Sequence, residues 1–162
     1  MDRQEISKVV EQVVKEVKSS SMTLSMAKEL ISGIEEKAGQ MGMSVVIAVV
    51  DKGARPVAVH CMDGAYIASY DIALNKAFTS AGLKMSTAEL SGLSGPGGPL
   101  YGIQHTNGGK IVIFGGGEPL LINGSVAGAL GVSGGTLEED TYLAAYGKEL
   151  WNAARHNADE QR

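Results

Sequence analysis

Residues 44–64, SVVIAVVDKGARPVAVHCMDG, decide the fold that we predict for this chain. Val45–Val50 is an unbroken apolar run rich in β-branched residues, which favours a strand covered on both faces. Turn residues follow at Asp51–Gly53, and the extended pattern resumes over Pro56–Met62. We therefore predict a β-hairpin at the centre of the domain.

Side chains alternate between faces along the second strand of this hairpin. His60 and Cys61 should therefore point to opposite sides of the sheet, which argues against a Cys-His nucleophile. Asp63 comes directly after the strand and can cap a helix that begins near Ala65 and ends at about Gly82.

Outside the hairpin, the chain shows the periodicities of helices and short strands. An apolar stripe at helical spacing predicts an amphipathic helix over residues 1–18: Ile6, Val9, Val10, Val13, Val14 and Val17. Further helices are predicted after the caps Thr23, Ser86 and Thr136, the last two within capping boxes. Three more strands are predicted at Ile111–Phe114, Pro119–Ile122 and Ser125–Val132, with Gly115–Gly117 and Asn123–Gly124 as hairpin turns.

These elements predict an α+β fold, with a five-stranded antiparallel sheet flanked by helices. The expected organisation is an amphipathic helix (1–18), a linker (19–21), one domain (22–157) and a frayed tail (158–162). Small residues from Ala65 to Ala81, together with the final helix around Trp151, offer apolar surface beyond what one sheet can cover, so we expect a homo-oligomer.

Composition excludes several classes of partner. The chain has 162 residues, 44% of them apolar, a net charge of −4 and a pI near 5.4, so neither a nucleic-acid nor a membrane surface is expected. Cys61 is the single cysteine, which rules out an intrachain disulfide. The start is not a secretory signal, and a cytoplasmic location is expected. The glycine-rich stretches match neither a P-loop nor a dinucleotide-binding fingerprint, and no nucleophile elbow supports Ser-His-Asp catalysis.

Two blocks carry a family resemblance. Residues 45–81 contain M-D-G-A and I-A-x-x-K-A, and residues 115–144 contain G-G-x-P and G-A-x-G-V-S-G-G followed by an aspartate. Together they resemble the GlcG/HbpS-like family, also met as the C-terminal domain of PduO-type proteins, over about residues 22–151. The resemblance implies a profilin-like α-β-α sandwich, often oligomeric, and haem binding.

Imidazole is a common axial ligand of haem iron, and His60 and His105 are the histidines inside predicted ordered segments. With the resemblance, they become the candidate iron ligands, and Tyr101 and Met62 join them as candidate haem contacts. The resemblance also implies a histidine near the start of the domain, and Met22–Met43 lacks one.

The helix over 1–18 followed by a small polar linker resembles the encapsulation peptides of bacterial microcompartment cargo. We therefore expect a haem-binding accessory or cargo protein inside such a compartment, with the stripe contacting shell or cargo proteins. Two alternatives stay open. One is an enzyme acting on haem or a small organic acid through the Gly95–Thr106 loop with His60 and His105, and the other is a structural cargo protein without a cofactor.

Overall fold

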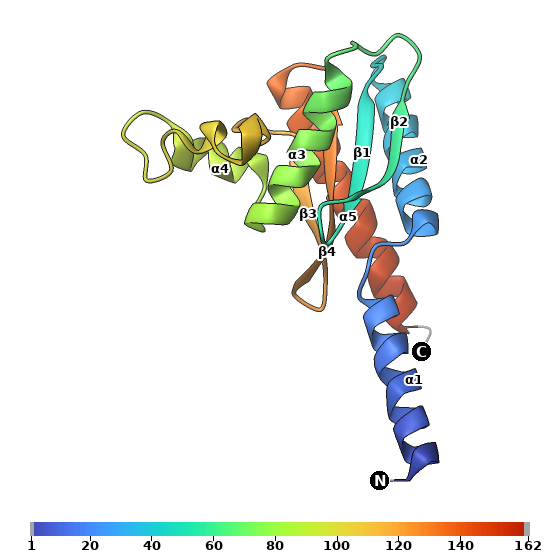
Figure 1. Ribbon diagram of the computed structural model, residues 1–162. Coiled ribbons are helices and arrows are strands. Elements are labelled where there is room, and N and C mark those ends of the chain that lie inside the picture. Colours follow the sequence, from blue (N-terminus) through green and yellow to red (C-terminus); the bar gives the residue numbers. More distant parts are fainter. Residues whose placement is uncertain (1, 161–162) are drawn as a thin grey trace.

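The computed structural model describes residues 2–160, apart from the side chains of residues 15–19 and 157–160. Figure 1 shows the elements. The strands are β1 (Val46–Asp51), β2 (Pro56–Cys61), β3 (Gly117–Ile122) and β4 (Ser125–Ser133). The helices are α1 (Arg3–Ser19), α2 (Leu24–Gln40), α3 (Ser69–Leu83), α4 (Thr87–Ser94) and α5 (Leu137–Glu160), with 3-10 turns η1 (Ile103–His105) and η2 (Asn107–Gly109).

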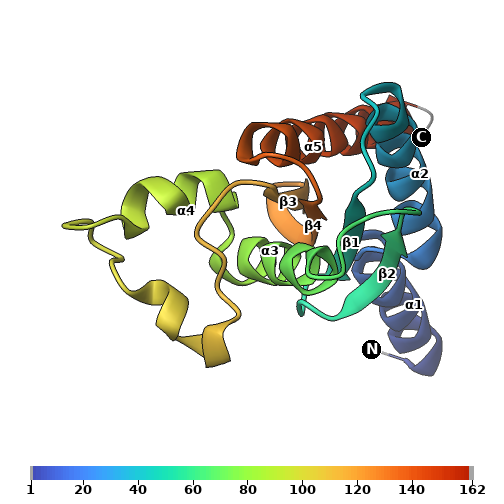
Figure 2. The same cartoon turned by 90° about the horizontal axis from the view of Figure 1, so that it is seen from above.

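A four-stranded antiparallel sheet forms the middle layer, in the order β2-β1-β4-β3. Side chains alternate along β1 and the residue before it: Val45, Ile47 and Val49 pack under α2 and α5, and Val46, Ala48 and Val50 pack under α3. Helices α2 and α5 thus cover one face and α3 the other (Figure 2). The predicted α+β fold with an antiparallel sheet between helices is confirmed.

The prediction of a fifth strand, at Ile111–Phe114, is wrong. Ile111–Phe114 is a loop, and it lies against α3 instead of adding to the sheet. The Val112 N–H donates to Thr79 Oγ1 at 3.0 Å, and the Thr79 hydroxyl is also 3.3 Å from Lys110 O. Because a helix side chain satisfies this backbone, the apolar run does not need a neighbouring strand. Gly115–Gly117 is therefore an entry into β3 and not a hairpin turn.

The predicted start of α3 is also wrong. Ala68, without a side-chain cap, precedes the first helical residue, Ser69. Asp63 does not cap it, because a turn in which the Ala65 N–H donates to Met62 O at 3.0 Å separates the strand from the helix. The segment between them leaves Ile67 97% exposed.

The other local signals are confirmed. Thr23 Oγ1 accepts from Met26 N at 3.3 Å, and both capping boxes close, Ser86 with Glu89 and Thr136 with Glu139. Positive φ at Asn123 and Gly124, 50° and 77°, forms the β3–β4 hairpin turn.

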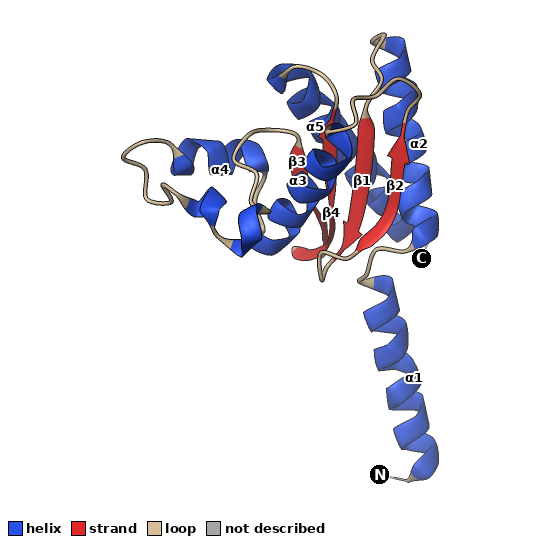
Figure 3. Ribbon diagram, turned by 45° about the horizontal axis from the view of Figure 1, so that its top comes forward, coloured by secondary structure: helices blue, strands red, loops and turns tan. Residues whose placement is uncertain are grey.

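Helix α1 projects away from the three layers in Figures 1 and 3. Its stripe is exposed: Ile6, Val9, Val10, Val13 and Val14 show 45% to 53% of their surface. Val17 belongs to the helix, but its side chain lies outside the described residues. At the other end, α5 continues to Glu160, into the predicted 158–162 tail. None of the described helices has the length and apolar content needed to cross a membrane.

Most of the surface on which the oligomer prediction rested is used inside the chain. Ala73, Ala77 and Ala81 are buried between α3 and the sheet, and Trp151 is 3% exposed, its Nε1–H donating to Leu121 O at 2.8 Å. These buried residues therefore leave no surface for a second chain. The close approach of α3 depends on Gly131, where an added Cβ would meet Ala73 O and lie 2.8 Å from Ala77 N.

Candidate functional site

The two sequence blocks, far apart in the chain, meet at one buried ion pair. Lys76 on α3 donates from Nζ to Asp140 Oδ2 on α5 at 2.7 Å and to Val132 O on β4 at 2.8 Å. The Lys76 side chain is 0% exposed and that of Asp140 is 7% exposed. Asp140 Oδ1 accepts from Gly134 N at 3.1 Å and from Gly135 N at 2.8 Å. The pair therefore ties α3, β4 and α5 together at one end of the sheet.

Burial lowers the pKa of Lys76 below its ordinary value of 10.5, and the bond to Asp140 works in the opposite direction. The ring of Phe114 lies 5.1 Å from Nζ, at cation–π distance. The ammonium group is thus surrounded by a carboxylate, a carbonyl and an aromatic face.

Glycine is required beside this pair. At Gly116, with φ of 114°, an added Cβ would lie 2.6 Å from Lys76 Nζ, and at Gly117 it would lie 2.7 Å from Lys76 O. At Gly115 it would meet Thr141 Oγ1. This run keeps side chains out of the space that α3 and α5 occupy, which explains the G-G-x-P block better than a turn does.

A hollow of about 510 Å³ opens above the ion pair. Its apolar wall comes from Tyr66, Ile72, Phe114 and Leu137. Its polar lining includes Ser69, Ser133 and Asp140, each about 95% buried or more. Sites for small molecules have this character, mainly apolar with a few convergent polar groups.

Sequence reasoning missed this site. The available signal was Lys76 itself, a lysine within the small-residue face of α3 between Ala73 and Ala77. A charge at such a position needs a buried partner, and the aspartate that ends the second block was available.

The predicted cofactor residues lie elsewhere, in two places. His60 is on edge strand β2, where its Nδ1 is 2.8 Å from Glu35 Oε1 of α2, and Met62 packs on the core nearby. Tyr101 and His105 lie in the arm, residues 87–110, which extends beyond the β3 side of the sheet (Figures 1 and 2). A single chain does not bring His60 and His105 together.

His60 and Cys61 pair with Ile47 and Val46 of β1, so they face opposite sides of the sheet as predicted. Cys61 is exposed and does not pack in the core. Among the described residues, no group of three or more His, Cys, Asp or Glu could hold a metal ion.

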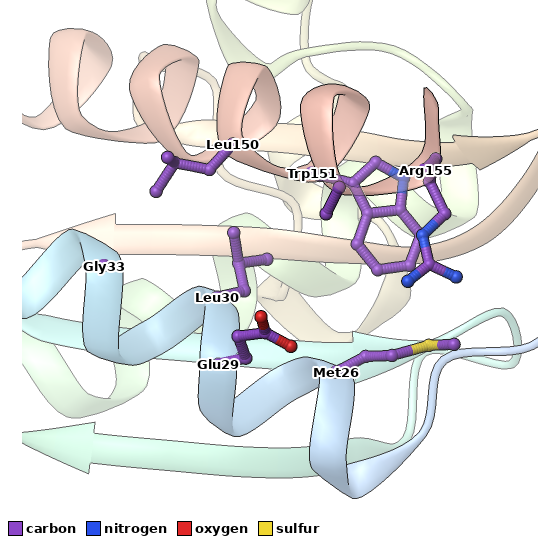
Figure 4. A pocket seen from close by; sticks show the side chains of 8 residues that line it. Met26, Glu29, Leu30, Gly33, Leu150, Trp151 and Arg155 are labelled. Atoms are coloured by element: carbon purple, nitrogen blue, oxygen red, sulfur yellow. The ribbon is translucent and has the colours of Figure 1, made fainter. Parts of the chain in front are cut away.

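A second, smaller hollow of about 280 Å³ lies between α2 and α5. Figure 4 shows Met26, Glu29 and Leu30 of α2 facing Leu150, Trp151 and Arg155 of α5. The Arg155 guanidinium lies 4.9 Å from the centre of the Trp151 ring. None of the residues predicted to bind a cofactor lines this hollow.

The chemistry of His60 is compatible with haem iron, which its imidazole would hold if the group were bound. A carboxylate oxygen can only accept, so Glu35 takes the Nδ1–H and leaves Nε2 as the nitrogen with a lone pair. Histidine ligands of metals commonly carry such an outer carboxylate. The His60 side chain is 41% exposed, so a ligand can reach it. His105 lies in the arm, on a different part of the chain from His60.

Comparison with known proteins agrees with this fold. A Citrobacter freundii protein, the uncharacterized 15.0 kDa protein in the dhaT-dhaS intergenic region, is 46% identical over 125 residues, 77% of this chain and 88% of the relative. The corrinoid adenosyltransferase PduO of Salmonella typhimurium is 33% identical over 142 residues, which cover 88% of this chain and 42% of the relative. This chain thus spans less than half of PduO.

Solved structures show the same architecture. Klebsiella pneumoniae ORFY is 42% identical with a TM-score of 0.80, covering 83% of this chain and 92% of that one. The structure described as a PduOC:heme complex is 33% identical with a TM-score of 0.77, covering 80% and 94%. The family model described as haem degrading protein HbpS-like matches residues 22–149, and this chain therefore belongs to the HbpS-like family.

Proposed function

We propose that this protein is a haem-binding accessory protein whose exposed histidines supply iron ligands. The observation that carries the proposal is the His60–Glu35 contact at 2.8 Å, which orients an accessible imidazole on an edge strand. Membership of the HbpS-like family and the likeness to the PduOC:heme complex support haem as the ligand.

In this proposal, His60 would hold the iron through its free ring nitrogen, and Glu35 would orient the ring and increase its basicity. Met62 directly follows β2 and is partly buried against the core, and it would add apolar contact to the bound group. Tyr101, 67% exposed, and His105 act from the arm, which requires a second chain if both histidines serve one haem. Bound haem would supply an iron centre for redox or ligand-binding chemistry.

Titration with haemin tests this assignment. His60→Ala should weaken or shift the Soret band, and Glu35→Gln should weaken binding by about tenfold, since it alters only an outer contact. His105→Ala measures the contribution of the arm, and His156→Ala in α5 is the matched control. Unchanged haemin affinity in His60→Ala, His105→Ala and the double variant would contradict the assignment.

Two alternatives predict different results. If the protein is an enzyme that uses the Gly95–Thr106 loop and both histidines, two chains are needed to form the active site. Dilution to monomer should then abolish turnover of haem or a small organic acid. A cofactor-free cargo protein should give no Soret band at any haemin concentration.

We further propose that α1 directs the protein into a bacterial microcompartment within the cytoplasm. Five described aliphatic side chains of its stripe are about half exposed, and α1 projects from a domain that the family model matches from residue 22 onward. An amphipathic helix of this kind docks its apolar face in a groove of a partner, here a shell or cargo protein.

Fusion of residues 1–18 to a fluorescent protein should carry it into microcompartment shells. Val10→Asp with Val14→Asp should abolish this by placing charges on the docking face, while Lys8→Asp, away from the stripe, should not. A diffuse intact fusion would contradict the targeting role.

We also propose a homo-oligomer, now through the large exposed side chains at the start of the Ala65–Ala81 stretch. Tyr66, Ile67 and Tyr70 are 73%, 97% and 46% exposed; Tyr66 and Ile67 lie between β2 and α3, and Tyr70 is in the first turn of α3. Clustered apolar side chains of this kind mark contact surfaces. Light scattering should report more than one chain, and Ile67→Lys should lower the mass; a monomeric parent protein at micromolar concentration would refute the proposal.

A further inference from the structure

The hollow above the Lys76–Asp140 pair has a composition that selects its ligand. It lies where the start of α3, the end of β4 and the start of α5 converge, and its volume of about 510 Å³ is that of a small-molecule site. Phe114 and Leu137 are 43% and 52% exposed on its wall, so an apolar body placed there removes apolar surface from water.

The charges in the hollow are already neutralised. Asp140 is the one carboxylate among the described lining residues, and both of its oxygens are occupied, Oδ1 by the Gly134 and Gly135 N–H groups and Oδ2 by Lys76. Lys76 in turn donates to Asp140 and Val132 O. An anionic ligand would find no free cation here and would lie beside the Asp140 carboxylate, so a carboxylic acid is disfavoured.

One buried donor remains for a ligand. Ser69 and Ser133 are each 4% exposed and line the hollow, with the Ser133 hydroxyl donating to Ser69 Oγ at 3.2 Å. Within the described part of the chain, the Ser69 hydroxyl makes no hydrogen bond as a donor. A buried hydroxyl proton without an acceptor is costly, and a ligand oxygen would satisfy it.

We propose that this hollow binds a small uncharged molecule, with an apolar body against Phe114 and Leu137 and a carbonyl or hydroxyl oxygen that accepts from Ser69. The site is separate from His60 and His105, and the proposal does not depend on haem. The corresponding carboxylic acid should bind to the hollow more weakly than the uncharged molecule.

A matched set of probes tests the proposal on the full chain. Acetophenone, 1-phenylethanol and benzoate share one ring and differ in the oxygen-bearing group, which is a carbonyl, a hydroxyl or a carboxylate. Affinities come from ligand-detected saturation-transfer NMR, which tolerates a large assembly. Acetophenone or 1-phenylethanol should bind at least about tenfold more tightly than benzoate, because only benzoate brings an unpaired charge. The tighter of the two neutral probes identifies the carbonyl or hydroxyl as the preferred group.

Variants locate the bound probe. Ser69→Ala should weaken the neutral probe about twofold to tenfold, the worth of one hydrogen bond. Ser94→Ala, an equally buried serine of α4 outside the hollow, is the control and should have no effect. Leu137→Glu, on an exposed wall position, should abolish binding without unfolding the chain, and it decides the matter if Ser69→Ala does not fold.

Three results would overturn the proposal: no binding of either neutral probe, benzoate binding as tightly as acetophenone, or equal affinities in Ser69→Ala and Ser94→Ala. None of them bears on haemin binding, because the Soret titration reports on the histidines.

Discussion

Removing the carboxylate of Asp140 should be among the most damaging single changes in this protein. In Asp140→Ala the Lys76 ammonium, 0% exposed, would keep Val132 O as its described hydrogen-bond acceptor, and the Gly134 and Gly135 N–H groups would lose theirs. Breaking a buried pair in this way costs about 3–5 kcal/mol. Domains of this kind have a total stability of about 5–15 kcal/mol, so a large part of it would be lost.

The assay is urea unfolding followed by circular dichroism. Lys76→Met should cost less than Asp140→Ala, because Asp140 keeps two N–H donors. In the double variant Lys76→Met with Asp140→Asn, the amide oxygen can still accept from the glycines. The double variant should therefore lose less unfolding free energy than the two single variants Lys76→Met and Asp140→Asn lose together, by more than about 1 kcal/mol.

Lys148→Met provides the comparison, because it removes a pair of similar length, 2.8 Å to Glu118 Oε2, in which the lysine is 40% exposed. Water reaches the lysine of this pair, so its loss should cost less than that of the fully buried pair. A loss below about 1 kcal/mol for Asp140→Ala, or strictly additive losses in the double variant, would refute the idea that the buried pair holds the three elements together.

Three further predictions follow from the packing. The free energy of unfolding should rise as the pH increases toward 10.5, because burial lowers the pKa of Lys76 in the folded chain and the unfolded chain then binds more protons than the folded one. Lys76→Met should remove that rise in urea titrations at a series of pH values. Gly131→Ala should cost about 1–3 kcal/mol or more in the same assay, since the new Cβ meets the backbone of α3, whereas Gly92→Ala, with open space around it, should be neutral or stabilising. Deleting residues 2–18 should leave the melting temperature nearly unchanged, because the described stripe residues are half exposed; a large drop in a calorimetric scan would show that α1 belongs to the core.

The sequence by itself determined the local elements. The apolar run of β1, the capping boxes at Ser86 and Thr136, and the Asn123–Gly124 turn depend on neighbours a few residues away, and all are found where the residues predict them. The opposite facing of His60 and Cys61 likewise follows from strand geometry alone.

Only the tertiary structure decided which distant groups meet. Ile111–Phe114 has the composition of a strand, yet Thr79 of α3 takes the backbone bond that a neighbouring strand would have taken. The two candidate histidines are separated because the sheet ends at β2 on one side and the arm leaves from the other. The ion pair joins residues 64 positions apart, and no local pattern reports such a contact, because burial of a charge becomes favourable only when the whole fold supplies its partner.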